Sequence, residues 1–384
     1  MTRWAPHLYR KEGERQDVDP NIINKSLWHT NILNDKGLLP VLSLGHLSFL
    51  TDIPYWKLRF YVARRLETFG PGSIKHYKIY RSFQIKKKSG GFRRICVPNQ
   101  DLLKVQRYID RFILGKIKAG PYSYAFEKGQ SIVDCAQQHL GCKWLIKIDL
   151  RNFFESLSEI QVYRVFREHG YQSLISFELA RICTKESQSA IKNQSRWWKN
   201  GHKAGIESYH SDKIGHLPQG APTSPKLANL IVKSLDTEIA CIAETFGLVY
   251  TRYADDLTLS TDSDAFNRKS AKEIIRKIYE ILPKHGLMPH PQKTQIVPPG
   301  ARKVVLGLLV DGDNVRLSKE FRSKLECHWY FCAKNPIGHA NQRGFDSLFG
   351  LKNYLNGLIA YARQIDLAFV NKLQVKFGVI KWPI

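Results

Sequence analysis

Cysteine is scarce in this sequence, and its few occurrences are too scattered to organise a fold. The 384-residue chain has seven cysteines, an odd number, with no Cys-x-x-Cys pair. This pattern argues against a structural zinc site and against a disulfide framework. We therefore expect reduced thiols at Cys96, Cys135, Cys142, Cys183, Cys241, Cys327 and Cys332.

Long apolar runs are also missing. The longest, from Leu38 to Leu50, is interrupted by His46 and falls well short of the ~20 residues that span a bilayer. The N-terminal stretch MTRWAPHLYRKEGERQDVD is charged and has no apolar core before a small-residue cleavage site. These absences predict a cytoplasmic protein with no membrane partner.

Acidic side chains are greatly outnumbered by basic ones. Asp and Glu total 34 against 59 Lys and Arg, which gives a formal net charge of +25. Such an excess favours a polyanionic partner, and nucleic acid is the first candidate. The content of 43% hydrophobic and 11% aromatic residues predicts a large folded protein with two or three packed lobes.

The order of helix and strand patterns indicates a mixed α+β chain. Thr51 and Pro54 predict the start of a helix that runs to about Phe69, and residues 86–91 predict a basic hairpin. Residues 184–216 are polar and basic and predict a long loop or insertion. Apolar periodicity predicts helices over 101–117, 225–246, 271–282, from Asp149 to about Cys183 and from 318 onward, and strands over 143–149, 248–260 and 304–317.

Three aspartates at strand ends form a candidate catalytic centre. Asp149 ends the strand KWLIKID, and Asp255 and Asp256 stand where two short strands meet. Phosphoryl transfer by two metal ions needs carboxylates from different strands that converge on cations ~4 Å apart. Taken alone, adjacent aspartates more often only decorate a turn. Because neighbours on a strand face opposite sides, we assign the direct metal contact to Asp255 and a weaker one to Asp256.

A loop of small and cyclic residues, LPQGAPTSP (217–225), lies between these aspartates and directly precedes a helix. Its glycine allows close backbone approach to a ligand, and Gln219 can hydrogen-bond a nucleotide. The ordered set KIDLRNFF (147–154), LPQGAPTSP and TRYADDLTLS (251–260) closely resembles the palm motifs of reverse transcriptases, and within them the bacterial retron type. All three motifs occur in the family's order and spacing.

The resemblance covers about residues 40–310. RRICVP (93–98) resembles the fingers motif, residues 286–294 the next palm motif, and VLG (305–307) the primer-grip hairpin. Two positions depart from the retron pattern. Leu306 stands where these enzymes have the threonine of Val-Thr-Gly, and Cys135 stands where they have the asparagine of Asn-Ala-x-x-His.

The resemblance implies roles for individual side chains. Arg93, supported by Lys86 to Lys88, would bind the incoming triphosphate, although a lysine run is as often a solvated face. Phe154 would lie under the sugar and exclude a 2′-hydroxyl, whereas a lone phenylalanine would simply belong to the core. Gln219 would contact the nucleotide or template. Lys293 would supply a proton or charge to the leaving pyrophosphate.

RNA contacts are expected in two further regions. The basic aromatic segment RWWK, including Arg196 and Lys199, and the C-terminal helical lobe would grip RNA through phosphate contacts and stacking. Leu306 and Gly307 would contact the primer. The alternative for the aromatic residues 329–331 is an ordinary helical core.

The implied fold is a right-hand polymerase of the α+β class, with an antiparallel palm sheet. The expected divisions are an N-terminal extension (1–50), fingers (51–140), a palm (141–311) that contains the segment 184–216, and a helical, RNA-binding thumb (312–384).

The implied activity is that of an RNA-directed DNA polymerase, a nucleotidyltransferase that uses two Mg²⁺ ions and deoxynucleoside triphosphates. A retron enzyme would use a cognate noncoding RNA as template and as primer, starting from a guanosine 2′-hydroxyl. Its product would be a branched RNA-DNA hybrid (msDNA), and an effector protein of an antiphage defence system would be a partner. The alternatives are another bacterial defence or intron-type reverse transcriptase, and a noncatalytic RNA-binding scaffold, against which the intact aspartates argue.

Overall fold

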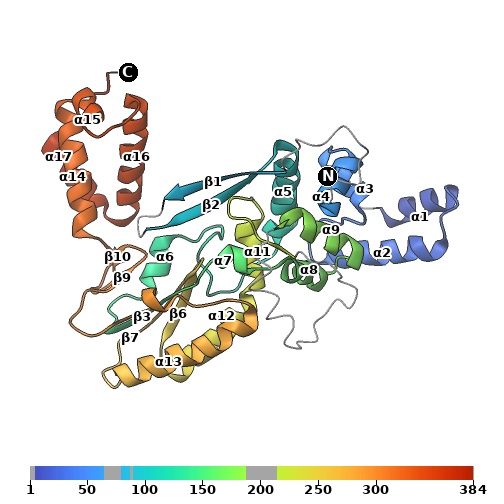
Figure 1. The fold of residues 1–384 in the computed structure, drawn as a ribbon, viewed down its shortest axis with the longest axis horizontal. Coiled ribbons are helices and arrows are strands. Elements are labelled where there is room, and N and C mark those ends of the chain that lie inside the picture. The colour runs from blue at the N-terminus through green and yellow to red at the C-terminus, as the bar shows by residue number, and fades with distance from the viewer. Residues whose placement is uncertain (1–4, 65–78, 87–89, 187–213, 384) are drawn as a thin grey trace. The chain divides into compact units, whose positions relative to one another are not determined.

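The computed structural model is a mixed assembly of helices and antiparallel sheets (Figure 1). It describes residues 5–64, 79–86, 90–186 and 214–383. The α+β class expected from the sequence is confirmed. No helix in these ranges is long and apolar enough to cross a bilayer. The seven cysteines all lie in these ranges and are free thiols, as expected.

The chain divides into two compact units, which are described separately. Unit 1 comprises Met1–Glu127, Leu150–Ile239 and Lys277–His290, and unit 2 comprises Lys128–Asp149, Ala240–Arg276 and Pro291–Ile384. Each unit therefore draws on segments that are far apart in the sequence. The sequence-based divisions after residues 50, 140 and 311 follow chain order, and they stay predictions.

Unit 1 begins with the helices α1 (Pro6–Arg15), α2 (Pro20–Asp35), α3 (Leu44–Thr51) and α4 (Tyr55–Ala63). The expected helix start at Thr51 is wrong, because the Thr51 hydroxyl donates to the Leu47 carbonyl within α3 instead of capping a new helix. Asp52 then ends α3 in a left-handed conformation (φ 52°), and Pro54 is the N-cap of α4. The remainder of the expected helix, to Phe69, lies outside the described residues.

A basic hairpin and an amphipathic helix follow, as the sequence predicts. Strands β1 (Tyr80–Lys86) and β2 (Phe92–Pro98) pair antiparallel, and residues 87–89 between them lie outside the described ranges. Helix α5 (Gln100–Phe112) begins after Asn99, whose side chain accepts a hydrogen bond from the Leu102 amide. This cap satisfies an amide of the first turn and fixes where the helix starts.

The later elements of unit 1 are mostly short helices: α7 (Phe153–Ser156), α8 (Glu159–Glu168), α9 (Ser173–Cys183) and α11 (Ser224–Ile231). The residues of α12 (Lys233–Thr245) and α13 (Arg268–Ile281) are divided between the two units. The two ends of the predicted loop 184–216 pair as the strands β4 (Lys185–Glu186) and β5 (Gly215–His216). Residues 187–213 lie outside the described part of the chain.

Unit 2 contains a four-stranded antiparallel sheet in the order β6-β7-β3-β8. Its strands are β3 (Trp144–Asp149), β6 (Val249–Tyr253), β7 (Asp256–Thr261) and β8 (Gln295–Val297). Helix α6 (Ile132–Gln137) contacts β6. The expected strands over 143–149 and 248–260 are thus confirmed.

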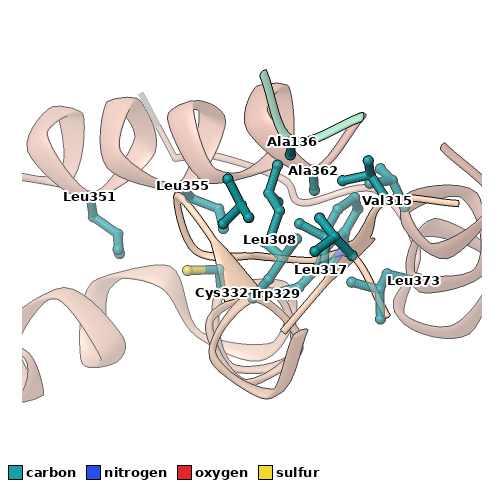
Figure 2. Packing of buried hydrophobic residues seen from close by; sticks show 14 of the residues in the cluster. Ala136, Leu308, Val315, Leu317, Trp329, Cys332, Leu351, Leu355, Ala362 and Leu373 are labelled. Atoms are coloured by element: carbon teal, nitrogen blue, oxygen red, sulfur yellow. The ribbon is translucent and has the colours of Figure 1, made fainter. Parts of the chain in front are cut away.

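The C-terminal part of unit 2 joins a small sheet to a helical bundle (Figures 1 and 2). Strands β9 (Val304–Val305), β10 (Leu308–Leu309) and β11 (Arg316–Leu317) precede helices α14 (Lys319–Lys334), α15 (Pro336–Gln342), α16 (Leu348–Ile365) and α17 (Leu367–Phe377). Leu308, Leu317, Trp329, Leu355 and Leu373 are buried in one cluster, which ties the sheet to the bundle. Trp329 is therefore a core residue, as the alternative for residues 329–331 predicted.

A buried ion pair connects helices that are distant in the sequence of unit 1. One Arg64 nitrogen lies 2.5 Å from Glu159 Oε2, and the other donates to the Thr184 hydroxyl at 2.6 Å. The side chains of Arg64 and Glu159 are only 7% and 2% exposed. Arg181 Nε lies 3.5 Å from the other Glu159 oxygen. The carboxylate is thus held between two guanidinium groups at the base of β4 and β5.

Removing Arg64 should destabilise unit 1 severely. Arg64→Met removes one partner of the buried Glu159 carboxylate, and we expect a loss of about 3 kcal/mol in the free energy of unfolding. This value is at the low end of the cost of breaking a buried ion pair, because Arg181 remains beside the carboxylate. Denaturant unfolding would measure it. Lys104→Met is the matched control, since Lys104 and Asp52 are 53% and 98% exposed and such pairs contribute about 0–1 kcal/mol. Equal losses in both variants would contradict this account.

Candidate active site

Strand register brings two of the predicted aspartates together. Asp149 is the last residue of β3, Asp256 is the first of β7, and the two are direct partners in the antiparallel ladder. Partners in such a ladder project to the same face, with Cβ atoms ~4.5–5.5 Å apart. The register is set behind them by buried apolar pairs, Ile148 with Leu257 and Ile146 with Leu259, because a slip of one residue would expose them.

The third aspartate lies in the turn between β6 and β7. Asp255 follows Ala254, which adopts a left-handed conformation (φ 55°) that costs a non-glycine residue about 1–2 kcal/mol. Arg252, a fully buried side chain of β6, donates a hydrogen bond from Nη1 to the Ala254 carbonyl at 3.2 Å. This bond holds the strained turn. Which aspartate contacts metal most directly stays a prediction.

Lys293 forms an ion pair with the first aspartate. Its Nζ donates to both carboxylate oxygens of Asp149, at 3.1 and 2.9 Å, from the short 3₁₀ helix η4 (Pro291–Lys293). The Lys293 side chain is 45% exposed and that of Asp149 is 16% exposed. The predicted lysine thus lies at Asp149, one of the three predicted catalytic carboxylates.

The Asp256 carboxyl is buried next to two other carboxylates. Burial, with the charges of Asp255 and Asp149, raises the pKa of the Asp256 carboxyl to about 6, against the opposing effect of Lys147 and Lys293. The sequence analysis missed Lys147. The signal was present, because Lys147 precedes Asp149 by two residues and therefore shares its face of the strand. Arg252 gave no such signal, since a charged residue in a strand is usually exposed.

The donor set fits a hard divalent cation by its chemistry. Carboxylate oxygens are the ligands that Mg²⁺ prefers, and the charges of Asp255 and Asp149 add to burial in raising the pKa of Asp256, while Lys147 and Lys293 oppose them. Among the residues that the structure describes, no three His, Cys, Asp or Glu side chains are gathered closely enough to form a ready metal cluster. A cation would therefore draw these carboxylates together.

In unit 1, the predicted loop 217–225 is bonded to the fingers hairpin. The Gln219 carbonyl accepts from the Cys96 amide of β2 at 2.7 Å. Gly220 has φ +112°, and a Cβ there would lie 3.0 Å from Ile95 Cγ2 and 3.1 Å from the Cys96 carbonyl. Only glycine fits this contact. It fixes the loop to the strand that carries Arg93, whose side chain is exposed.

Phe154 lies in α7 beside the fully packed Phe153. Its ring is 5.5 Å from that of Phe153 and 6.2 Å from that of Phe126. Phe153 is buried, whereas Phe154 is only partly so. Part of the Phe154 ring is therefore open to a ligand.

The remaining predicted contacts lie in a turn or outside the residues that the structure describes. Leu306 and Gly307 form the turn between β9 and β10, both with positive φ (50° and 85°). Arg196 and Lys199 lie outside the described residues, as do two of the lysines at 86–88.

Comparison with known proteins agrees with this geometry. The model of the family "Reverse transcriptase (RNA-dependent DNA polymerase)" matches residues 85–330. The chain is 34% identical over 309 residues to the retron Ec86 reverse transcriptase of Escherichia coli, covering 78% of this chain and 82% of that protein. It is 28% identical over 330 residues to the retron Mx65 reverse transcriptase of Myxococcus xanthus, covering 82% and 70%. A solved telomerase from Candida albicans aligns at 12% identity and a TM-score of 0.42, over 84% of this chain and 61% of that one.

The chain therefore belongs to the reverse transcriptase family, and within it to the bacterial retron type. The expected polymerase fold and RNA-directed DNA polymerase activity are confirmed with it. The noncatalytic scaffold, which the sequence left open, is thereby set aside. Dependence on a divalent metal is general in this family.

Proposed function

We propose that this reverse transcriptase copies a cognate structured noncoding RNA into a branched RNA-DNA hybrid, msDNA, within an antiphage defence system that includes a separate effector protein. The observation that carries the proposal is the pairing of Asp149 with Asp256 beside Asp255, in a chain whose relatives are named retron reverse transcriptases. The net charge of +25 supports an RNA partner.

Asp149, Asp255 and Asp256 would hold two Mg²⁺ ions. When bound, the ions supply contacts to the attacking and leaving oxygens of the phosphoryl transfer. Lys293 would balance the charge of Asp149 before the cations enter and then donate a proton or charge to the departing pyrophosphate. Its exposed side chain leaves it free to change partners.

Residues of unit 1 would bind the incoming nucleotide. Arg93 would contact the triphosphate, Gln219 the base or template, and Phe154 the sugar. Hydrogen bonding of the base cannot distinguish a ribonucleotide, because the bases pair alike. Rejection of the 2′-hydroxyl therefore falls to shape, and a rigid ring that is held by Phe126 and Phe153 supplies it.

The C-terminal helices of unit 2 would grip the RNA, together with the primer turn at Leu306 and Gly307 and the segment that contains Arg196 and Lys199. Several cations of the bundle lie over aromatic rings, such as Lys334 over Tyr330 at 4.4 Å and Lys324 over Tyr354 at 5.1 Å. Such pairs offer both a phosphate contact and a stacking surface.

The proposed msDNA product is tested by expressing the protein together with its flanking genomic region. The nucleic acid that copurifies with the protein is then sequenced. We expect one RNA joined covalently to DNA complementary to part of it. Recovery of complementary DNA that is never joined to RNA would contradict the msDNA proposal, while leaving reverse transcription intact.

The metal role is tested at Asp255. Asp255→Asn keeps the shape of the side chain but removes a charge, and we expect primer extension to fall about 10²–10³-fold while RNA binding survives, since metal contacts supply several kcal/mol of transition-state stabilisation. The control is Asp264→Asn, at an 86% exposed aspartate of the same unit. Near-normal extension by Asp255→Asn would refute the assignment.

Sugar selection is tested at Phe154. Phe154→Val opens space for a 2′-hydroxyl, and we expect discrimination between dGTP and GTP to fall about tenfold to a hundredfold, because steric overlap costs about 1–3 kcal/mol. Single-nucleotide incorporation with each substrate measures it. Phe166→Val, at a buried ring of α8 that packs on Tyr171, is the matched control, which should lower stability and keep discrimination. Unchanged discrimination with collapsed activity in Phe154→Val would place the sugar gate elsewhere.

A further inference from the structure

A buried histidine bridges the two strands of the hairpin that carries Asp255 and Asp256. His139 follows α6, and its ring lies 2.7 Å from the Thr251 hydroxyl through Nε2 and 2.7 Å from the Ser260 hydroxyl through Nδ1. Thr251 belongs to β6 and Ser260 to β7. All three side chains are buried. One imidazole thus joins both strands on the face of the sheet that carries Asp256.

The thiol that replaces the retron asparagine joins the same network. Cys135 Sγ donates to the Thr251 hydroxyl at 3.4 Å. Burial lowers the pKa of His139 to about 4, so the ring is neutral near pH 7, with one nitrogen that donates and one that accepts. Both ring nitrogens are satisfied in the tautomer in which Thr251 donates to Nε2 and Nδ1 donates to Ser260. The bonds then run in one direction, from Cys135 through Thr251 and His139 to Ser260.

The bridged strands determine where the catalytic residues lie. Thr251 stands four positions before Asp255, which lies in the turn after β6, and Ser260 stands four positions after Asp256, the first residue of β7. Thr251 pairs with Thr258 and Val249 with Ser260, so the two hydroxyls that the ring contacts are diagonal neighbours across the β6-β7 ladder. A shift of either strand would break one of the two bonds.

The helix that presents His139 is itself fixed. Ser131 caps α6 by accepting from the Asp134 amide, and the Asp134 carboxylate accepts from the Ser131 amide at 2.7 Å. Cys135 and Ala136 of this helix are buried. The ring is therefore attached to a rigid element, which is what a positioning role requires.

We propose that His139 is a positioning residue for DNA synthesis: its ring locks β6 against β7 in the register that sets Tyr253 opposite Asp256 and so fixes the turn that carries Asp255. The inference rests on the proposed catalytic role of the aspartates. It also assigns Cys135 a role at the position where this chain departs from the retron pattern, as the donor that orients Thr251 toward the ring.

The test separates positioning from stability. His139→Phe keeps a ring but removes both hydrogen bonds, and we expect kcat for single-nucleotide incorporation to fall about tenfold to a hundredfold, since a displacement of ~1 Å costs up to ~10²-fold. The KM for the nucleotide should stay within about twofold, because no nucleotide contact is lost. Thr251→Val added to His139→Phe should cause little further loss, because the two share one network.

Two further variants keep the proposal falsifiable. Ser260→Ala removes only one of the two hydrogen bonds and should lower kcat less than His139→Phe. If His139→Phe does not fold, Ser260→Ala provides the test. Ile274→Ala empties a buried position of α13, an element that supplies no residue of the network, and it should lower the unfolding temperature while kcat is retained. If the His139 and Ser260 variants lose stability like Ile274→Ala but keep kcat, His139 is only a core residue.

Failure of this inference differs from failure of the proposed function. If Asp255→Asn abolishes synthesis while His139→Phe keeps kcat, the positioning role alone is overturned. If Asp255→Asn keeps synthesis, the catalytic assignment itself falls.

Discussion

The antiparallel pairing of β3 with β7 is the constraint on which the site depends. Buried aliphatic pairs set its register, and that register forces Asp149 and Asp256 to face the same side as neighbours. Like charges at this separation repel, so the apolar core holds together an arrangement that the carboxylates alone would oppose. Lys293 on Asp149 and Lys147 on the same face of β3 offset part of this repulsion. Burial and the two neighbouring carboxylates still raise the pKa of Asp256.

Further buried polar groups hold the hairpin that completes the site. Arg252 bonds the carbonyl of the left-handed Ala254, and His139 bridges the strands that lead into and out of the turn. Each group lies away from solvent, where a hydrogen bond is strong and its loss is costly. The hairpin is thus preformed, while a cation would still draw the carboxylates together.

Local patterns in the sequence predicted the local structure. They failed where contacts between distant residues determine the conformation or burial of a side chain. The strands that end at Asp149 and meet at Asp255 were predictable because alternation and turn residues are short-range signals. Thr51 was misread because the same residue type caps a helix or bonds back within one, and Ser43 had already supplied the cap of α3. The pairing of Asp149 with Asp256 spans more than 100 residues of chain, so spacing alone could not show it. The burial of Arg252 could not be predicted from the sequence either.

The central claim is that the strand register crowds carboxylates into a site that needs cations, and thermal unfolding of Asp256→Asn with and without Mg²⁺ tests it most directly. Because its folded-state pKa is raised, the charged Asp256 is destabilising at neutral pH, so the neutral amide should raise the unfolding temperature in EDTA. With saturating Mg²⁺ the order should reverse, since the unaltered protein gains stability from binding and the variant gains much less. Asp264→Asn should behave like the unaltered protein in both conditions. If Asp256→Asn is less stable in EDTA, or if Mg²⁺ stabilises both proteins equally, the account is contradicted.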